Sequence, residues 1–70
     1  MTATALITYL DESTITITAD TAQGVADLRR FAEAAHLPGE SRFVDADIDG
    51  TRQSIVIDHG DLAAVRLEAS

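Results

Sequence analysis

The chain has 70 residues, no cysteine and a formal net charge of −7. This length fits one small domain spanning residues 1–70, and the lack of cysteine excludes disulfide staples and thiolate metal sites. The five basic residues are scattered arginines, so the sequence argues against direct binding to nucleic acid or to anionic membranes, which depends on clustered positive charge.

The first two predicted elements are strands over residues 3–10 and 14–19. Isoleucines alternate with threonines in the second segment, which is the period of two typical of a half-buried strand. A three-residue loop over 11–13 is expected to join them and to place Ile7 opposite Ile17.

A helix is predicted over residues 21–36. Asp20 is the expected N-cap, and Gln23 three residues later completes a capping-box pattern. Pro38 disfavours helical dihedrals at the residue before it and therefore ends the helix. Small and apolar residues form one stripe that is expected to face a sheet: Gly24, Val25, Leu28, Phe31, Ala32 and Ala35.

Three further strands follow the helix. The first covers residues 41–48 and turns at Asp49-Gly50, the strongest hairpin signal in the chain, in a register that places Val44 opposite Ile55. A third hairpin is expected at residues 58–60, with the last strand at 62–68. The predicted fold is α+β, in the order ββαβββ, with one mostly antiparallel sheet of about five strands and a single helix on one face.

The two faces of the predicted sheet are both partly apolar. A single helix covers only one face, and several large apolar side chains left in water would weaken a small domain, so we expect a partner to cover the other. The residues expected on that uncovered face are Leu6, Leu10, Phe43, Val56, Leu62 and Ala64. An isologous homodimer is the simplest arrangement that would bury them.

No motif in the sequence predicts catalysis, a cofactor or a metal. Residues 45–50 match the first half of an EF-hand loop, but Arg52 and Val56 occupy positions where that loop needs an aliphatic residue and a glutamate. His59 lies between two aspartates, and no serine, threonine or lysine nucleophile is placed beside it by the sequence, so an exposed turn residue is expected. We therefore expect a protein that is not an enzyme.

Acidic residues gather near two turns that the sequence suggests are neighbours. They are Asp45, Asp47, Asp49, Asp58 and Asp61. The leading hypothesis is a protein-interaction module or small accessory protein that self-associates through the sheet face opposite the helix, with Asp45 and Asp47 at the rim of its apolar centre. The alternative is an acidic inhibitor, or nucleic-acid mimic, that binds a basic protein.

The sequence also bears on location and source. It has no basic leader and no long apolar run, so a cytoplasmic location is expected. The absence of lysine among many alanines, aspartates and arginines indicates a GC-rich genome, as in actinobacteria or their phages.

Overall fold

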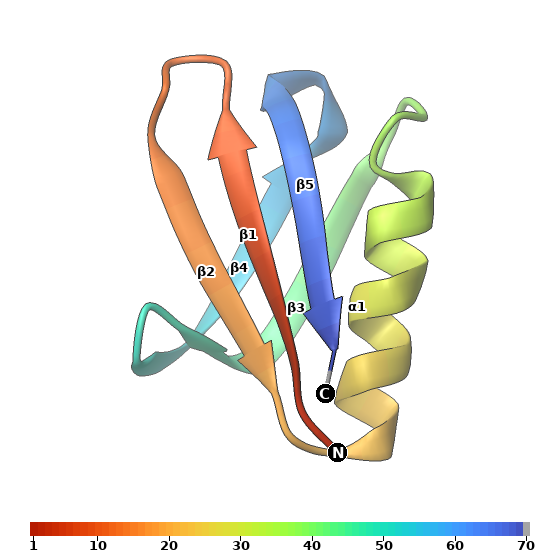
Figure 1. Cartoon of the computed structure of the whole chain (residues 1–70). Coiled ribbons are helices and arrows are strands. Elements are labelled where there is room, and N and C mark those ends of the chain that lie inside the picture. Colours follow the sequence, from red (N-terminus) through yellow and green to blue (C-terminus); the bar gives the residue numbers. More distant parts are fainter. Residues whose placement is uncertain (70) are drawn as a thin grey trace.

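The computed structural model describes residues 1–69 as a five-stranded antiparallel sheet with one helix (Figure 1). This confirms the predicted ββαβββ order and the α+β class. The elements are β1 (Ala3–Tyr9), β2 (Thr14–Ala19), α1 (Ala22–Ala34), β3 (Glu40–Ile48), β4 (Thr51–Asp58), the 3₁₀ turn η1 (His59–Asp61) and β5 (Leu62–Ala69).

The order of the strands across the sheet is β4-β3-β2-β1-β5. β1 therefore lies between its sequence neighbour β2 and the last described strand. Ile7 lies opposite Ile15, and Ala5 opposite Ile17, so the expected pairing of Ile7 with Ile17 is wrong by two residues. A shift of two leaves every side chain on its predicted face, and the inward positions of β1 and β2 are correct.

The hairpin of β3 and β4 turns at Asp49-Gly50, as predicted. Asp49 has a φ of 53° and Gly50 a φ of 85°, the pair of positive values that a two-residue type I′ turn requires. Before the turn, in β3, Asp45 also has a positive φ, 56°. The register of the β3–β4 pairing shifts there, between Phe43 and Ala46. This β-bulge adds one residue to β3.

The bulge reverses the expected faces of two residues on β3. Phe43, and not Val44, lies opposite Ile55. Phe43 packs against the core, whereas Val44 is 72% exposed. The prediction for this pair is wrong because an extra residue in a strand moves every side chain beyond it to the other face.

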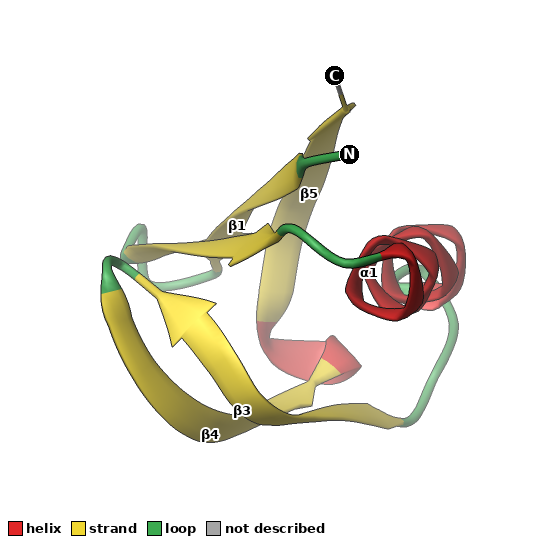
Figure 2. Ribbon diagram, turned by 90° about the horizontal axis from the view of Figure 1, so that it is seen from below, coloured by secondary structure: helices red, strands yellow, loops and turns green. Residues whose placement is uncertain are grey.

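The connection from β4 to β5 differs most from expectation. Residues 58–60 do not form a hairpin, because β4 and β5 lie at opposite edges of the described sheet. The Asp58 carboxylate accepts a hydrogen bond from the Gly60 amide at 2.9 Å, which begins the 3₁₀ turn η1. So short a link between the two edges requires a curled sheet, and Figure 2 shows the β3–β4 pair bent away from β1, β2 and β5 with α1 at the open side.

The helix begins one residue later than expected. Thr21 is the N-cap, and its hydroxyl accepts a hydrogen bond from the Gly24 amide at 3.1 Å. The assignment of Asp20 as N-cap is therefore wrong, and Gln23 instead donates to Asp27 at 3.0 Å. A Cβ on Gly24 would lie 3.0 Å from the Ala19 Cβ, so glycine lets α1 start close against the end of β2.

The core lies between α1 and the concave side of the sheet. Val25, Leu28 and Phe31 are the buried residues of the helix, as the apolar stripe predicted. The strands contribute Ala3, Ala5, Ile7, Ile17, Ile48 and Ile57. Within residues 1–69, α1 is too short and too polar to cross a membrane.

Candidate functional site

The predicted partner surface is only partly present. Leu6, Leu10 and Val56 are exposed by 42%, 66% and 49%. Phe43 and Leu62 instead pack against the core, and their placement on the uncovered face is wrong. The structure therefore separates the proposed apolar centre into isolated residues.

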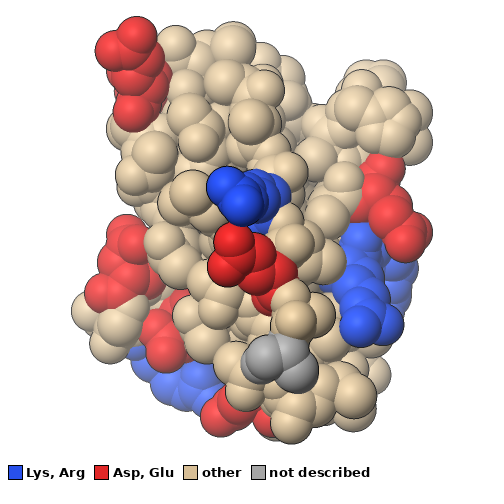
Figure 3. All heavy atoms as spheres, in the orientation of Figure 1, with Lys and Arg blue, Asp and Glu red and all other residues tan. Residues whose placement is uncertain are grey.

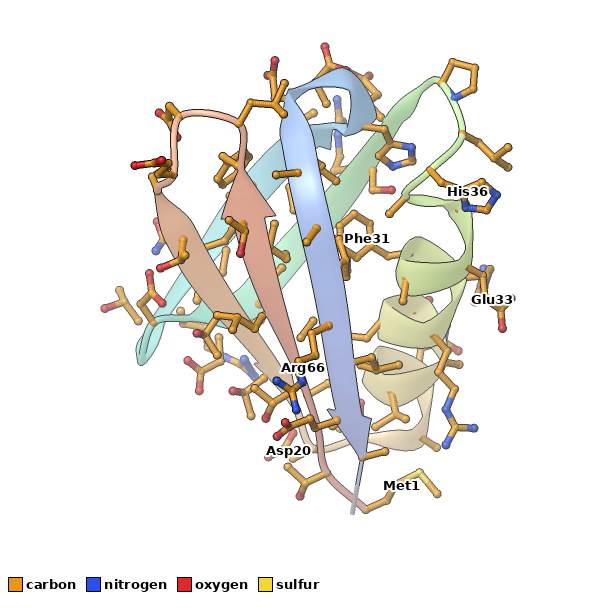
Figure 4. All side chains as sticks on the ribbon, turned by 45° about the horizontal axis from the view of Figure 1, so that its top comes forward. Met1, Asp20, Phe31, Glu33, His36 and Arg66 are labelled. Carbon is orange, nitrogen blue, oxygen red and sulfur yellow. The ribbon has the colours of Figure 1, made fainter. Side chains whose placement is uncertain are left out.

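Phe43 and Leu62 turn inward for related reasons. The bulge on β3 brings the Phe43 ring edge-on to Phe31, with ring centroids 5.4 Å apart. Figure 4 shows Phe31 projecting from α1 toward the strands. Leu62 lies opposite Tyr9, just past a register shift between Thr8 and Tyr9. Both positions follow strand irregularities that a period of two does not reveal.

The convex side of β5, β1 and β2 is mostly uncharged and hydroxyl-rich. Leu6 lies opposite Thr16 on β2 and opposite Arg66 on β5. Arg66 and Glu68 form an exposed ion pair at 3.5 Å. In Figure 3 charged side chains lie mainly around the margins of this side, with one basic and acidic pair nearer its middle. Leu6 is therefore a single apolar residue in a polar neighbourhood and does not form a patch.

The three aspartates near the Asp49-Gly50 turn all bond to groups of the protein itself. Asp45 pairs with Arg52 at 3.4 Å. Asp47 accepts from the Gly50 amide at 3.0 Å, and Asp49 accepts from the Thr16 amide at 2.9 Å. Among the described residues, no group of three or more acidic or histidine side chains converges as a metal site would require. These carboxylates shape the turn and attach it to β2.

The other acidic turn lies at the opposite end of β4, so the two turns are not neighbours as expected. Asp61 lies instead beside the β1–β2 loop, where its carbonyl accepts from the Leu10 amide at 2.9 Å. Partial burial, followed by the negative charges of Asp61 and Asp11, raises the pKa of Tyr9 above its ordinary value of 10.0. The Ser13 hydroxyl and amide donate to Asp11 and lower the pKa of that carboxyl. The acidic-inhibitor hypothesis stays a prediction.

The structure also brings together two residues that the sequence did not connect. The Ser41 hydroxyl lies 2.7 Å from Nε2 of His59, and Nδ1 of the same ring lies 3.0 Å from the Leu37 carbonyl oxygen. The His59 amide donates to the Gly39 carbonyl at 2.9 Å. His59 is partly buried, so the expectation of an exposed turn residue without a neighbouring serine is wrong.

A shallow hollow of about 290 Å³ adjoins this pair, between the second half of α1 and the start of β3. Phe31 lines it and lies 5.8 Å from the His59 ring, measured between ring centroids. Arg30 and Arg42 border it. Arg30 pairs with Asp27 at 3.0 Å, while Arg42 has no ion-pair partner among the described residues. Ser41 and His59 are 18 residues apart in the chain. No local sequence pattern spans that distance, so the sequence analysis did not predict their contact.

Comparison with protein-family models, with curated proteins and with solved structures found no match to this chain. Any functional statement therefore depends on the geometry described above.

Proposed function

We propose that this protein is an interaction module that associates with a second copy of itself through the free edge of β4, by antiparallel pairing of the two β4 strands. The supporting observation is the edge of the sheet at β4 (Thr51–Asp58), which among the described strands has a neighbour on one side only. Val56 on β4 is exposed at that edge, by 49%. An unpaired strand edge with exposed apolar side chains favours pairing with another chain.

The sequence of β4 suits such pairing. Charges occur only near its ends, at Arg52 and Asp58, and the five residues between them are uncharged. Soluble proteins commonly place a charge or a proline in the middle of an exposed edge to prevent association. The centre of β4 has neither.

The residue pairing with β3 determines which backbone groups of β4 are free. Ile48 and Thr51 flank the two-residue turn and lie opposite each other, so they form a hydrogen-bonded pair. Backbone groups alternate in direction along a strand, and we infer that Arg52, Ser54, Val56 and Asp58 direct their amides and carbonyls toward the free edge.

Two copies of β4 related by a two-fold axis at Ile55 would pair these free groups along almost the whole strand. Arg52 would lie opposite Asp58 of the second copy, and Ser54 opposite Val56 of the second copy. The same register that makes the longest ladder thus joins opposite charges at both ends. About eight backbone hydrogen bonds would form, two for each of four pairs.

The interface would be small, because it consists of one strand edge and its flanking side chains. Stable dimers usually bury at least about 1,200 Å² in total. We expect a reversible dimer with a Kd on the order of 10–100 µM.

Sedimentation equilibrium over a range of concentrations at physiological salt tests this proposal. The wild-type mass should rise from 7.4 kDa toward twice that value. Arg52→Asp and Asp58→Arg should each give monomers, because each places like charges opposite each other. An equimolar mixture of the two variants should dimerise again, because every cross-strand pair then joins opposite charges. The matched control is Leu6→Asp, an exposed apolar position on β1 that should leave the dimer intact.

A wild-type chain that stays monomeric at 1 mg/ml and above would refute self-association. A dimer that survives both charge reversals but is lost in Leu6→Asp would refute the β4 interface and favour the convex face of β1. Circular dichroism of each variant establishes that it is folded.

A further inference from the structure

We propose that Ser41 is a nucleophile activated by His59, and that the hollow beside them accepts a short-chain carboxylic ester. This inference is independent of self-association, because Ser41 faces α1 whereas the proposed dimer uses the free edge of β4. It also departs from the expectation, drawn from the sequence, of a chain without catalysis.

The hydrogen bonds fix the tautomer of His59. A carbonyl oxygen only accepts, so the 3.0 Å contact with Leu37 requires the proton on Nδ1. The neutral ring then has its lone pair on Nε2, and the Ser41 hydroxyl, 2.7 Å away, donates to it. A hydroxyl within 2.6–3.2 Å of a base that a third group orients is the arrangement found around activated serine nucleophiles.

The orientation of His59 is rigidly defined. Its backbone amide bonds to the Gly39 carbonyl, its ring bonds to the Leu37 carbonyl, and Phe31 packs beside the ring. Leu37 and Gly39 belong to the segment between α1 and β3, and Ser41 is the second residue of β3. The base is therefore held by the same short segment that leads to the nucleophile.

The hollow supplies complementary surroundings for an ester. The partly buried Phe43 ring provides apolar surface for a short acyl group, and the Phe31 ring packs edge-on behind it in the core. Arg42, which directly follows Ser41 and has no carboxylate partner among the described residues, is exposed and borders the hollow, so it adds positive charge near a bound ester, which favours the negative charge that develops on the carbonyl oxygen.

The reaction needs no further reagent besides water. Ser41 Oγ bonds to the ester carbonyl carbon while its proton passes to Nε2 of His59. The C–O bond to the alcohol then breaks, and the departing alkoxide takes that proton. Water, deprotonated by His59, attacks the acyl-serine, and the proton returns to Ser41 Oγ as the carboxylic acid leaves. The sum is ester plus water giving acid plus alcohol.

Labelling with an alkyl fluorophosphonate, followed by intact-mass and peptide mass spectrometry, tests the nucleophile. The wild-type chain should gain one phosphonyl group at Ser41 with loss of fluoride. Ser41→Ala should remain unlabelled. His59→Asn should label at least about 100-fold more slowly, because a general base contributes about 10²–10⁴ in rate. Asparagine retains an amide nitrogen near the position of Nδ1, so the bond to Leu37 can persist while the base is removed.

Ser13→Ala is the matched control, since Ser13 lies in the β1–β2 loop, away from both the hollow and the β4 edge, and its hydroxyl donates to Asp11 and not to a histidine. This variant should label at the wild-type rate. Hydrolysis of p-nitrophenyl acetate should follow the same order among the variants. No adduct on the wild-type chain, equal labelling of Ser13 and Ser41, or labelling of folded His59→Asn at the wild-type rate would each overturn the proposal.

Discussion

Replacing Phe43 by alanine tests the bulge that redirects β3. In the structure Phe43 is partly buried and its ring contacts Phe31 edge-on at 5.4 Å. Removing a fully buried phenylalanine costs about 3–5 kcal/mol, and an aromatic pair contributes about 0.5–1.5 kcal/mol of such a loss. For a partly buried ring we expect Phe43→Ala to lower the free energy of unfolding by about 2–3 kcal/mol.

The neighbouring residue provides the matched comparison. Val44 is 72% exposed, so Val44→Ala should change the free energy of unfolding by less than about 0.5 kcal/mol. A regular strand, as the sequence suggested, predicts the reverse order, with Val44 in the core and Phe43 in water. The two variants therefore distinguish the two registers directly.

Urea denaturation followed by far-ultraviolet circular dichroism measures both changes. A domain of 70 residues has a total stability of about 4–10 kcal/mol, so the loss in Phe43→Ala should be obvious and its thermal midpoint should fall by roughly 10–20 °C. If Val44→Ala is as destabilising as Phe43→Ala, the bulged register is wrong.

Two further predictions concern the helix start and the single tyrosine. Thr21→Ala should lower stability by about 1 kcal/mol through loss of the N-cap, while Asp20→Ala should change it by less than about 0.5 kcal/mol; urea denaturation measures both, and equal losses would contradict the cap assignment. Tyr9, the only tyrosine, should ionise at a higher pH in the folded chain than in urea, as followed by phenolate absorbance near 295 nm, because its pKa is raised in the folded state. The folded state then holds the phenol proton more tightly, so this contribution to stability is complete below pH 10 and declines as the pH rises from there toward the folded pKa. Asp61→Asn should bring the midpoint closer to that of the unfolded chain, and an unchanged midpoint would contradict the role of that charge.

Local patterns were sufficient for most of the fold. The alternation in β2, the stripe of Val25, Leu28 and Phe31, and the Asp49-Gly50 turn each reflect a preference that acts over a few residues. The element order and the helix-covered face follow from them.

The errors arise where a local deviation has distant effects. A positive φ at Asp45 reverses the faces of Phe43 and Val44, and aspartate in mid-strand gives no clear sign of it. Residues 58–60 resemble a hairpin turn, yet the Asp58 carboxylate satisfies the Gly60 amide and begins a 3₁₀ turn instead. The Ser41–His59 contact depends on the β3–β4 register and on the loop after α1, so no spacing in the sequence reveals it.

The position of β1 between β2 and β5 has a consequence for synthesis on the ribosome. Ala5 pairs with Ile17, twelve residues later, but on its other side it pairs with Leu67, sixty-two residues later. A nascent chain with β5 still in the exit tunnel would leave one side of β1 unpaired and Ile7 without its neighbour Val65. Such late, long-range pairing slows folding and exposes apolar strand to aggregation. Release of residues 62–69 is therefore the step that lets the domain complete its core.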